Sequence, residues 1–207
     1  MVRPPPLRFS DVRPALDRRP PPLSPHVARW LELLCEWNER IDLTAARTGG
    51  ELVDLMLADA AALSPQLPSG ARVVDVGTGA GAPGLALALM RPDLAVTLCE
   101  PLAKRASFLR TVIGSVGRTD VVLLAKRGEE LAHGAWDEAM ARATLPPQEW
   151  LALGAKLVKP GGGVWVLLAT GEAPERAGAT VTLDERYVWP ETNVTRRAVR
   201  YAIRESG

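Results

Sequence analysis

A glycine-rich segment, RVVDVGTGAGAPG, joins an apolar strand directly to a helix and limits the folds open to this chain more than any other feature. Its glycines Gly77, Gly79 and Gly81 remove side chains where the backbone must turn sharply and where a ligand must approach it closely. Gly84 would let the first turn of the following helix pack tightly against the sheet. Such a strand–turn–helix unit indicates an open α/β sheet.

Segments with strand character alternate with helical segments from Arg72 onward, which is typical of a mostly parallel sheet covered on both faces. The expected strands are 72–76, 95–99, 120–124, 137–141 and 163–168, and the expected helices are 81–90, 102–116 and 147–157. The last segments, TLDERYVWP and TRRAVRYAIR, have strand character with no helix between them, which favours an antiparallel pair at the sheet edge. We therefore predict a doubly wound, Rossmann-like α/β fold with seven strands.

The region before this sheet has a different composition. Residues 1–23 are rich in proline and arginine and are predicted to form an irregular arm with one short helix over 10–18. Residues 24–68 are predicted to form a helical cap, because apolar residues recur at spacings of three and four in a helix that starts near Ser24. Residues 69–207 would form the core, and 207 residues suffice for a single domain of this kind.

Composition narrows the setting in which the protein works. The formal net charge of +1 does not by itself indicate a nucleic-acid-binding protein. Cys35 and Cys99 belong to no CxxC motif and to no Cys/His cluster, so we expect two buried thiols and no metal site. No apolar stretch is long enough to cross a membrane. The expectation is a cytoplasmic monomer.

Two classes of cofactor compete for the glycine turn. Gly79, Gly81 and Gly84 satisfy the G-x-G-x-x-G pattern of dinucleotide-binding proteins. Asp75 favours S-adenosylmethionine instead, because it would repel a pyrophosphate at the helix N-terminus and could bond the amino-acid portion of the methyl donor. The additional Gly77 and the antiparallel terminal strands point the same way. We predict a methyltransferase, with an NAD-dependent oxidoreductase as the weaker alternative.

Polar residues follow the next strands at the edge where ligands of open α/β sheets bind. Glu100 lies 19 residues beyond Gly81 and could accept both ribose hydroxyls, although a solvated strand-end acid is the alternative. Gly128 and Glu129 could contact an adenine, or Glu129 and Glu130 could complement a helix dipole. Arg142 could hold a substrate phosphate or base, or form a salt bridge to an acid such as Asp75.

The order of motifs resembles the RsmG (GidB) family, which methylates N7 of a guanine in bacterial 16S ribosomal RNA. The motifs are WNERIDLT, ELVDLMLADAAAL, DVGTGAGAPGLALALMRPDLAVTLCEPLAKRASFLR, KRGEEL, ARAT, LVKPGGGVWVLLATG and RRAVRYAIR. The resemblance runs from about residue 26 to 204 and is strongest over 72–110. It implies S-adenosylmethionine as cofactor, and 16S ribosomal RNA or the small ribosomal subunit as partner.

The resemblance also assigns residues. It implies roles at the reacting centre for Arg142, beside the methyl donor, and for Asn38, in the helical cap. Together with the reasoning from the turn, the expected cofactor-binding residues are Asp75, Gly77, Thr78, Gly79, Gly81, Glu100, Arg127, Gly128, Glu129 and Arg142. Candidate partners for RNA phosphates are Arg8, Arg13, Arg18, Arg19, Lys104, Arg105, Arg196, Arg197 and Arg200.

Three positions depart from the family pattern. Asp42 stands where the family usually has Asn, Met56 where it usually has His, and Ala169 where it often has Lys. All three belong to the substrate side in the family. A diverged methyltransferase acting on a small molecule or a protein, or an inactive cofactor binder, is therefore the alternative to ribosomal RNA methylation.

Overall fold

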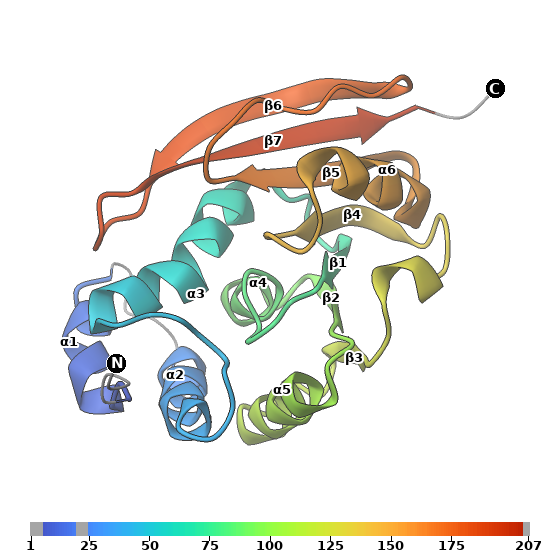
Figure 1. Ribbon diagram of the computed structural model, residues 1–207. Helices are drawn as coiled ribbons and strands as arrows, with labels where there is room; N and C mark the ends of the chain where they lie inside the picture. Colours follow the sequence, from blue (N-terminus) through green and yellow to red (C-terminus); the bar gives the residue numbers. More distant parts are fainter. Residues whose placement is uncertain (1–5, 20–24, 205–207) are drawn as a thin grey trace.

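The computed structural model describes residues 6–19 and 25–204 and contains one seven-stranded sheet in the order β3-β2-β1-β4-β5-β7-β6 (Figure 1). Its strands are β1 (Arg72–Val76), β2 (Ala95–Cys99), β3 (Val122–Leu124), β4 (Trp136–Ala141), β5 (Val158–Leu168), β6 (Ala179–Val188) and β7 (Thr195–Ile203). The first five strands are parallel, whereas β7 pairs antiparallel with both β5 and β6. The predicted fold class is confirmed.

Helices cover both faces of this sheet. They are α1 (Phe9–Asp17), α2 (Pro25–Asn38), α3 (Gly49–Leu63), α4 (Gly84–Met90), α5 (Ala103–Ser115) and α6 (Pro147–Leu157), with short 3₁₀ turns η1 (Ser64–Gln66) and η2 (Gly128–Glu130). Apolar residues of α1 to α5 share one buried cluster with one face of the sheet, and those of α6 share another with the opposite face. The order of the strands places the ends of β1, β2 and β4 side by side at one edge.

Two element starts differ from the sequence expectation by three residues or more. The helix expected over 81–90 begins at Gly84, because Gly81 adopts a φ of 111°, which is incompatible with a helix. The strand expected over 163–168 begins at Val158, and its early part pairs with Trp136 across a register shift. Consecutive glycines at the start of this strand had the appearance of a loop in the sequence.

The N-terminal helices are part of the main hydrophobic core. Leu16 of α1, Trp30 of α2 and Leu52 of α3 belong to the same cluster as Leu98 of β2. The expected short helix of the arm is therefore packed into the body of the molecule, against the same cluster as the helices α2 and α3. The predicted helix start near Ser24 lies outside the described residues.

Helix α3 ties the C-terminal hairpin β6–β7 to the rest of the fold. Asp54 is fully buried and accepts hydrogen bonds from the backbone N–H groups of Glu191 and Thr192, at 3.0 and 2.7 Å, in the turn of the hairpin. It also forms an ion pair of 2.6 Å with Arg19, just after α1. One carboxylate thus holds three separate parts of the chain together.

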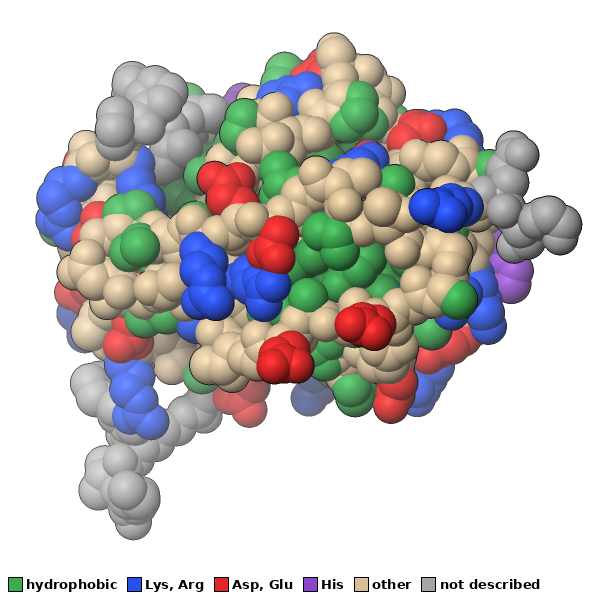
Figure 2. All heavy atoms as spheres, turned by 90° about the horizontal axis from the view of Figure 1, so that it is seen from above, with side chains coloured by type: hydrophobic (Ala, Val, Ile, Leu, Met, Phe, Trp, Pro, Cys, Tyr) green, Lys and Arg blue, Asp and Glu red, His purple; other side chains and the backbone are tan. Residues whose placement is uncertain are grey.

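The surface seen from above, over β6, carries basic and acidic side chains interspersed around an apolar area (Figure 2). This face does not gather charge of a single sign. Among the described helices, none is long and apolar enough to cross a membrane.

Candidate functional site

A cleft of about 740 Å³ lies at the carboxyl ends of β1, β2 and β4. Most of the predicted cofactor residues line it. They are Gly77, Thr78, Gly79, Glu100, Arg127, Gly128, Glu129 and Arg142. Asp75 and Gly81 do not line the cleft. The fold therefore gathers residues from four separate connections around one space, as the sequence predicted.

The three glycines of the turn serve different purposes, although all have positive φ values. A Cβ on Gly79 would have no atom nearer than the Gly77 carbonyl oxygen at 3.9 Å, so it would project into open space. A Cβ on Gly77 would instead collide with the Thr144 side chain, and one on Gly81 would lie 3.0 Å from Leu85. Only Gly79 is a glycine whose missing side chain leaves room on the cleft side.

Gly84 confirms the expected tight packing of α4 on the sheet, since a Cβ there would lie 2.6 Å from the Asp75 Cβ and 2.7 Å from Leu98. The turn is also supported from beneath by α2. The Trp30 indole Nε1 donates to the Ala80 carbonyl oxygen at 3.0 Å, and the ring is fully buried in the hydrophobic core.

Glu100 connects the two sides of the cleft. Its side chain is 2% exposed; Oε2 accepts a hydrogen bond from the Gly79 N–H at 3.0 Å and Oε1 accepts one from the Leu102 N–H at 2.8 Å. Each carboxylate oxygen can accept more than one hydrogen bond, so both retain capacity for a ligand. The alternative interpretation of Glu100 as a solvent-exposed acid at the strand end is therefore wrong.

The Thr78 hydroxyl adds a polar group to the same wall. Thr78 is 2% exposed, and a hydrogen bond from its hydroxyl lowers the pKa of the buried Asp75. Within the described part of the chain its Oγ1 has no other hydrogen-bond partner. A hydroxyl that donates one hydrogen bond keeps two lone pairs with which to accept others from a ligand or water. With the open side of Gly79 and the carboxylate of Glu100, this hydroxyl makes the cleft suitable for a ligand that carries hydroxyl groups.

Asp75 lies beneath the turn and is completely buried. Its Oδ2 accepts a hydrogen bond from the Gly84 N–H at 2.8 Å, at the first turn of α4. Burial raises the pKa of this carboxyl to about 6, against the opposing hydrogen bonds from the Thr78 side chain and the Gly84 amide and the charge of Arg142. The structure thus gives Asp75 contacts to α4 and no direct surface on the cleft.

The two acidic residues of the connection after β3, Glu129 and Glu130, have different surroundings. Glu130 accepts a hydrogen bond from the Arg127 N–H at 2.9 Å and so closes the short turn η2. Glu129 lines the cleft and remains exposed. Gly128 is buried, and a side chain would not fit there, since a Cβ would lie 2.7 Å from Val76. Both acids lie in the first turn of η2, but the hydrogen bond that closes this turn belongs to Glu130.

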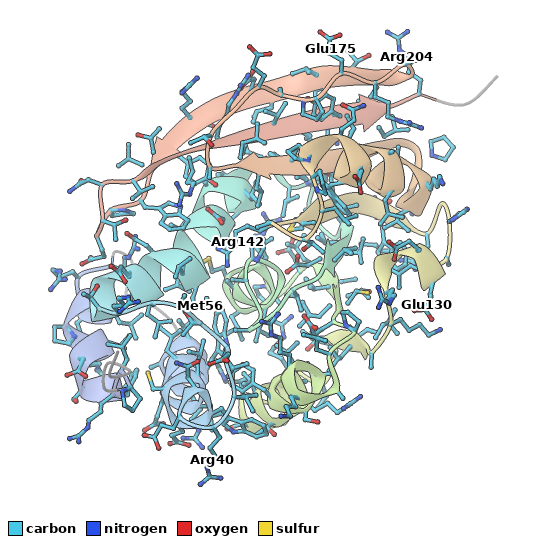
Figure 3. All side chains as sticks on the ribbon, in the orientation of Figure 1. Arg40, Met56, Glu130, Arg142, Glu175 and Arg204 are labelled. Carbon is cyan, nitrogen blue, oxygen red and sulfur yellow. The ribbon has the colours of Figure 1, made fainter. Side chains whose placement is uncertain are left out.

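Arg142 follows β4 and faces the cleft, near Met56 of α3 (Figure 3). Its Nη1 donates to Asp59 Oδ2 at 2.9 Å and to the Leu55 carbonyl oxygen at 2.5 Å. The expected salt bridge to an acid is confirmed, but the acid given as its example, Asp75, is not the partner. The partner is Asp59 on α3, a residue that the sequence alone did not single out because it lies within an ordinary helical pattern.

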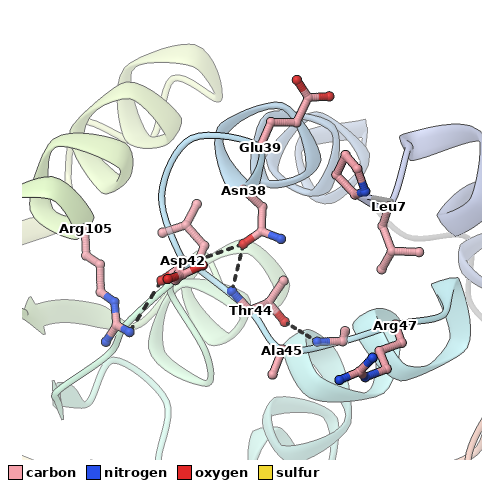
Figure 4. A pocket seen from close by; sticks show the side chains of 11 residues that line it. Leu7, Asn38, Glu39, Asp42, Thr44, Ala45, Arg47 and Arg105 are labelled. Carbon is pink, nitrogen blue, oxygen red and sulfur yellow. Dashed lines mark hydrogen bonds between the residues drawn. The ribbon is translucent and has the colours of Figure 1, made fainter. Parts of the chain in front are cut away.

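Asn38 lies in a neighbouring pocket of about 660 Å³, at the end of α2 (Figure 4). Its Oδ1 accepts hydrogen bonds from the backbone N–H groups of Leu43 and Thr44 at 2.9 and 3.1 Å. Leu43 lines both this pocket and the cleft. Asn38 therefore shapes the wall of the cleft from behind and does not itself reach it.

The three departures from the family pattern fall in three places. Asp42 lines the pocket beside Asn38 and Met56 lines the cleft, where it is 4% exposed. Ala169 lines a further cavity of about 350 Å³ that shares Arg142 and Thr144 with the cleft.

Several arginines that the sequence offered to RNA phosphates are engaged in ion pairs instead. These pairs are Arg13–Asp17, Arg18–Glu191, Arg19–Asp54, Arg197–Asp184 and Arg200–Glu138. Arg105, by contrast, lines both the cleft and the pocket of Asn38. Together with Arg127 and Arg142 it places basic side chains around the cleft itself.

The sheet with its antiparallel terminal pair and the cleft after the glycine turn place the molecule in the class of Rossmann-like methyltransferases. A solved structure of that fold, a SAM-dependent methyltransferase from Aquifex aeolicus, superposes with a TM-score of 0.55 at 17% identity and covers 73% of this chain and 92% of that one.

The chain belongs to the GidB family, described as rRNA small subunit methyltransferase G, whose model matches residues 24–185. A ribosomal RNA small subunit methyltransferase G from Sorangium cellulosum is 35% identical over 86% of this chain and 78% of that protein. The namesake from Xanthomonas axonopodis pv. citri is 39% identical over 66% of this chain, and the match spans only 64% of that relative's length. The resemblance seen in the sequence is confirmed, and it removes the ground for an NAD-dependent oxidoreductase.

Proposed function

We propose that this protein transfers the methyl group of S-adenosylmethionine to N7 of a guanine in 16S ribosomal RNA of the small ribosomal subunit. Membership of the family supports the reaction, since its relatives are named for methylation of small-subunit ribosomal RNA. The single observation that supports the cofactor is the meeting of Gly79, Thr78 and Glu100 at one cleft. We place the protein in the cytoplasm, as a monomer, where it would meet the subunit.

The residues of the cleft are suited to holding the methyl donor. Glu100 would accept hydrogen bonds from the ribose hydroxyls, and the backbone at Gly79 would allow the ligand to lie close. Gly128 and Glu129 would flank the adenine, with Arg127 at the outer rim. When bound, S-adenosylmethionine supplies an electrophilic methyl group on a sulfonium.

Guanine N7 needs no general base, because its lone pair lies in the plane of the ring and carries no proton. The lone pair forms the new N–C bond while the electron pair of the broken C–S bond goes to sulfur. The work of this chain is then to position the base and to exclude water, and positioning can lower such a barrier by about 7 to 11 kcal/mol. Arg142, fixed by Asp59, would orient the base beside the donor, and no metal is required.

Calorimetric titration with S-adenosylmethionine, S-adenosylhomocysteine and NAD, followed by tritiated methyl transfer to unmodified small subunits, tests the proposal. We expect binding of both methyl-donor ligands, no binding of NAD, and label on a guanine N7. Binding without transfer would favour a diverged methyltransferase or an inactive binder. Failure of both methyl-donor ligands to bind would refute the cofactor assignment.

A further inference from the structure

The cavity of about 350 Å³ that shares a wall with the cleft is lined by the segment after β4, by the end of β5 and by the C-terminal hairpin. Arg142 and Thr144 line both spaces. Ala143, between them, has a φ of 54°, a conformation that is unfavourable for alanine and persists only where the surroundings impose it. One short strained segment therefore separates the cleft from the cavity.

On the hairpin side, the wall of the cavity includes the Arg196 guanidinium, which stacks on the Trp189 ring. The guanidinium carbon of Arg196 lies 4.3 Å from the centroid of the Trp189 ring. Trp189 is 5% exposed and its Nε1 donates to Asp59 Oδ1 at 2.9 Å, so the ring has a fixed orientation. Within residues 6–19 and 25–204, Arg196 has no carboxylate partner, unlike its neighbours Arg197 and Arg200.

This arrangement suits a flat, uncharged ring better than a phosphate. Much of the remaining wall is apolar, including Leu145, Pro147 and Leu168, and the other cation in the cavity, Arg142, is already paired with Asp59. Proteins that bind unpaired RNA bases stack them on aromatic rings or on guanidinium planes. Enzymes that modify a base hold it in a pocket outside the helical stack.

The geometry points to this cavity as the pocket for the single unstacked purine that receives the methyl group, with the Arg196 guanidinium, backed by Trp189, as its stacking surface. This inference rests on the proposed function. Arg142 would contact the base on the cleft side and Arg196 on the hairpin side.

Asp59 is the residue that sets the distance between these two surfaces. Its Oδ2 accepts from Arg142, and its Oδ1 accepts from both Trp189 and the Tyr187 hydroxyl, the latter at 2.7 Å. Burial, and then the charge of Asp59, raises the pKa of Tyr187 well above its usual range, so Tyr187 stays a donor. Asp59 is thus a positioning residue for the pocket.

The test compares Arg196→Ala and Arg196→Lys with a matched control, Arg186→Ala, which removes an exposed arginine of the same hairpin that does not line the cavity. For tritiated methyl transfer to unmodified small subunits, we expect kcat/KM to fall about 10- to 100-fold in Arg196→Ala. Lysine keeps the charge but not the plane, so Arg196→Lys should stay close to the alanine variant. S-adenosylmethionine affinity should be unchanged in all three, and Arg186→Ala should match the wild type.

A different pattern would overturn the inference. Recovery of activity in Arg196→Lys, or a salt dependence of subunit binding that becomes shallower by about one unit in Arg196→Ala, would identify a phosphate contact instead. Unchanged kcat/KM in Arg196→Ala would exclude a role in binding the base. If the wild-type protein binds the methyl donor but labels no guanine on the subunit, the proposed function fails and the base pocket fails with it.

Discussion

Asp75 shows how a residue can belong to a functional loop without touching the ligand space. Its carboxylate is completely buried and is held by the first amide of α4. The folded-state pKa of about 6 lies above the ordinary value of 3.8, so the folded protein binds this proton more tightly than the unfolded chain. Asp75 therefore contributes to how stability varies with pH.

The sign of that contribution follows from the order of the two pKa values. Below pH 3.8 both states are protonated at Asp75 and there is no penalty. As the pH rises from 3.8 to about 6 the unfolded chain loses its proton first, so the folded state loses about 3 kcal/mol relative to it. In Asp75→Asn the loss of unfolding free energy between pH 4 and pH 7 should be smaller by most of that amount, about 2 kcal/mol. Urea unfolding at both pH values measures it, and equal losses in both proteins would contradict it.

Gly79 is where a side chain would fill the ligand space directly. Gly79→Val should abolish binding of S-adenosylmethionine in a calorimetric titration, because its side chain would project into the cleft. Gly70→Val is the matched control: its φ of 71° resembles the 61° of Gly79, but nothing lies within 4 Å of its Cβ position and it is outside the cleft. Both variants bear a similar backbone cost, about 1 to 2 kcal/mol. Equal loss of binding in both would show that backbone strain, and not the filled space, is responsible.

Glu100 joins a role in the fold to its proposed role toward the ligand. Glu100→Ala should weaken S-adenosylmethionine binding by about 1 to 3 kcal/mol, through the lost hydrogen bonds to the ribose. The same change leaves the amides of Gly79 and Leu102 without their acceptor, so the thermal midpoint should fall as well. Calorimetry and a thermal melt measure the two effects, and unchanged affinity would exclude Glu100 from the binding site.

The limits of prediction are also clearest at single residues. The glycine turn, Glu100 and Arg142 could be found because the carboxyl ends of parallel strands meet at one edge of a sheet. Asp59 could not be found, because its partners Arg142, Tyr187 and Trp189 are 83 to 130 residues away in sequence. A local sequence pattern does not show which buried acid a distant arginine pairs with.

At the scale of elements, α3 acts as a clamp on the hairpin through Asp54. Asp54→Ala should reduce the free energy of unfolding by about 3 to 5 kcal/mol, because it leaves Arg19 and two backbone amides of the hairpin turn without their buried acceptor. Asp184→Ala, which breaks the more exposed pair with Arg197 on the same hairpin, should cost at most about 1 kcal/mol. Urea unfolding of both variants provides the comparison, and similar losses would contradict a clamp at Asp54.

Element types were predictable here, whereas their ends were less so. Alternation of apolar strands and amphipathic helices gave the sheet and its antiparallel edge. The start of β5 was missed because glycines at 161–163 resemble a turn, while in the fold the strand is fixed by pairing with β4. The start of α4 was missed because the positive φ of Gly81 is set by packing against Trp30 and Leu85.

The whole molecule has its N-terminal helices and one face of its sheet in a single hydrophobic cluster. Leu16→Ala in α1 and Leu98→Ala in β2 should therefore lower the same unfolding transition, each by about 2 to 5 kcal/mol. Midpoints followed by tryptophan fluorescence and by far-UV circular dichroism should coincide in both variants. A Leu16→Ala variant that leaves the transition of the sheet in place would instead support an independent arm.

The different surroundings of the three turn glycines bear on how this loop can evolve. Gly77 is confined by Thr144, and Gly81 by Trp30 and Leu85, so each is tied to a side chain of the protein itself. Substitutions at positions 77 and 144, and at 81 and 30, should covary among related sequences, with a change at one site opening the way to a change at the other. Position 79 has no such neighbouring side chain, so we expect another residue there only in related proteins that no longer bind the ligand.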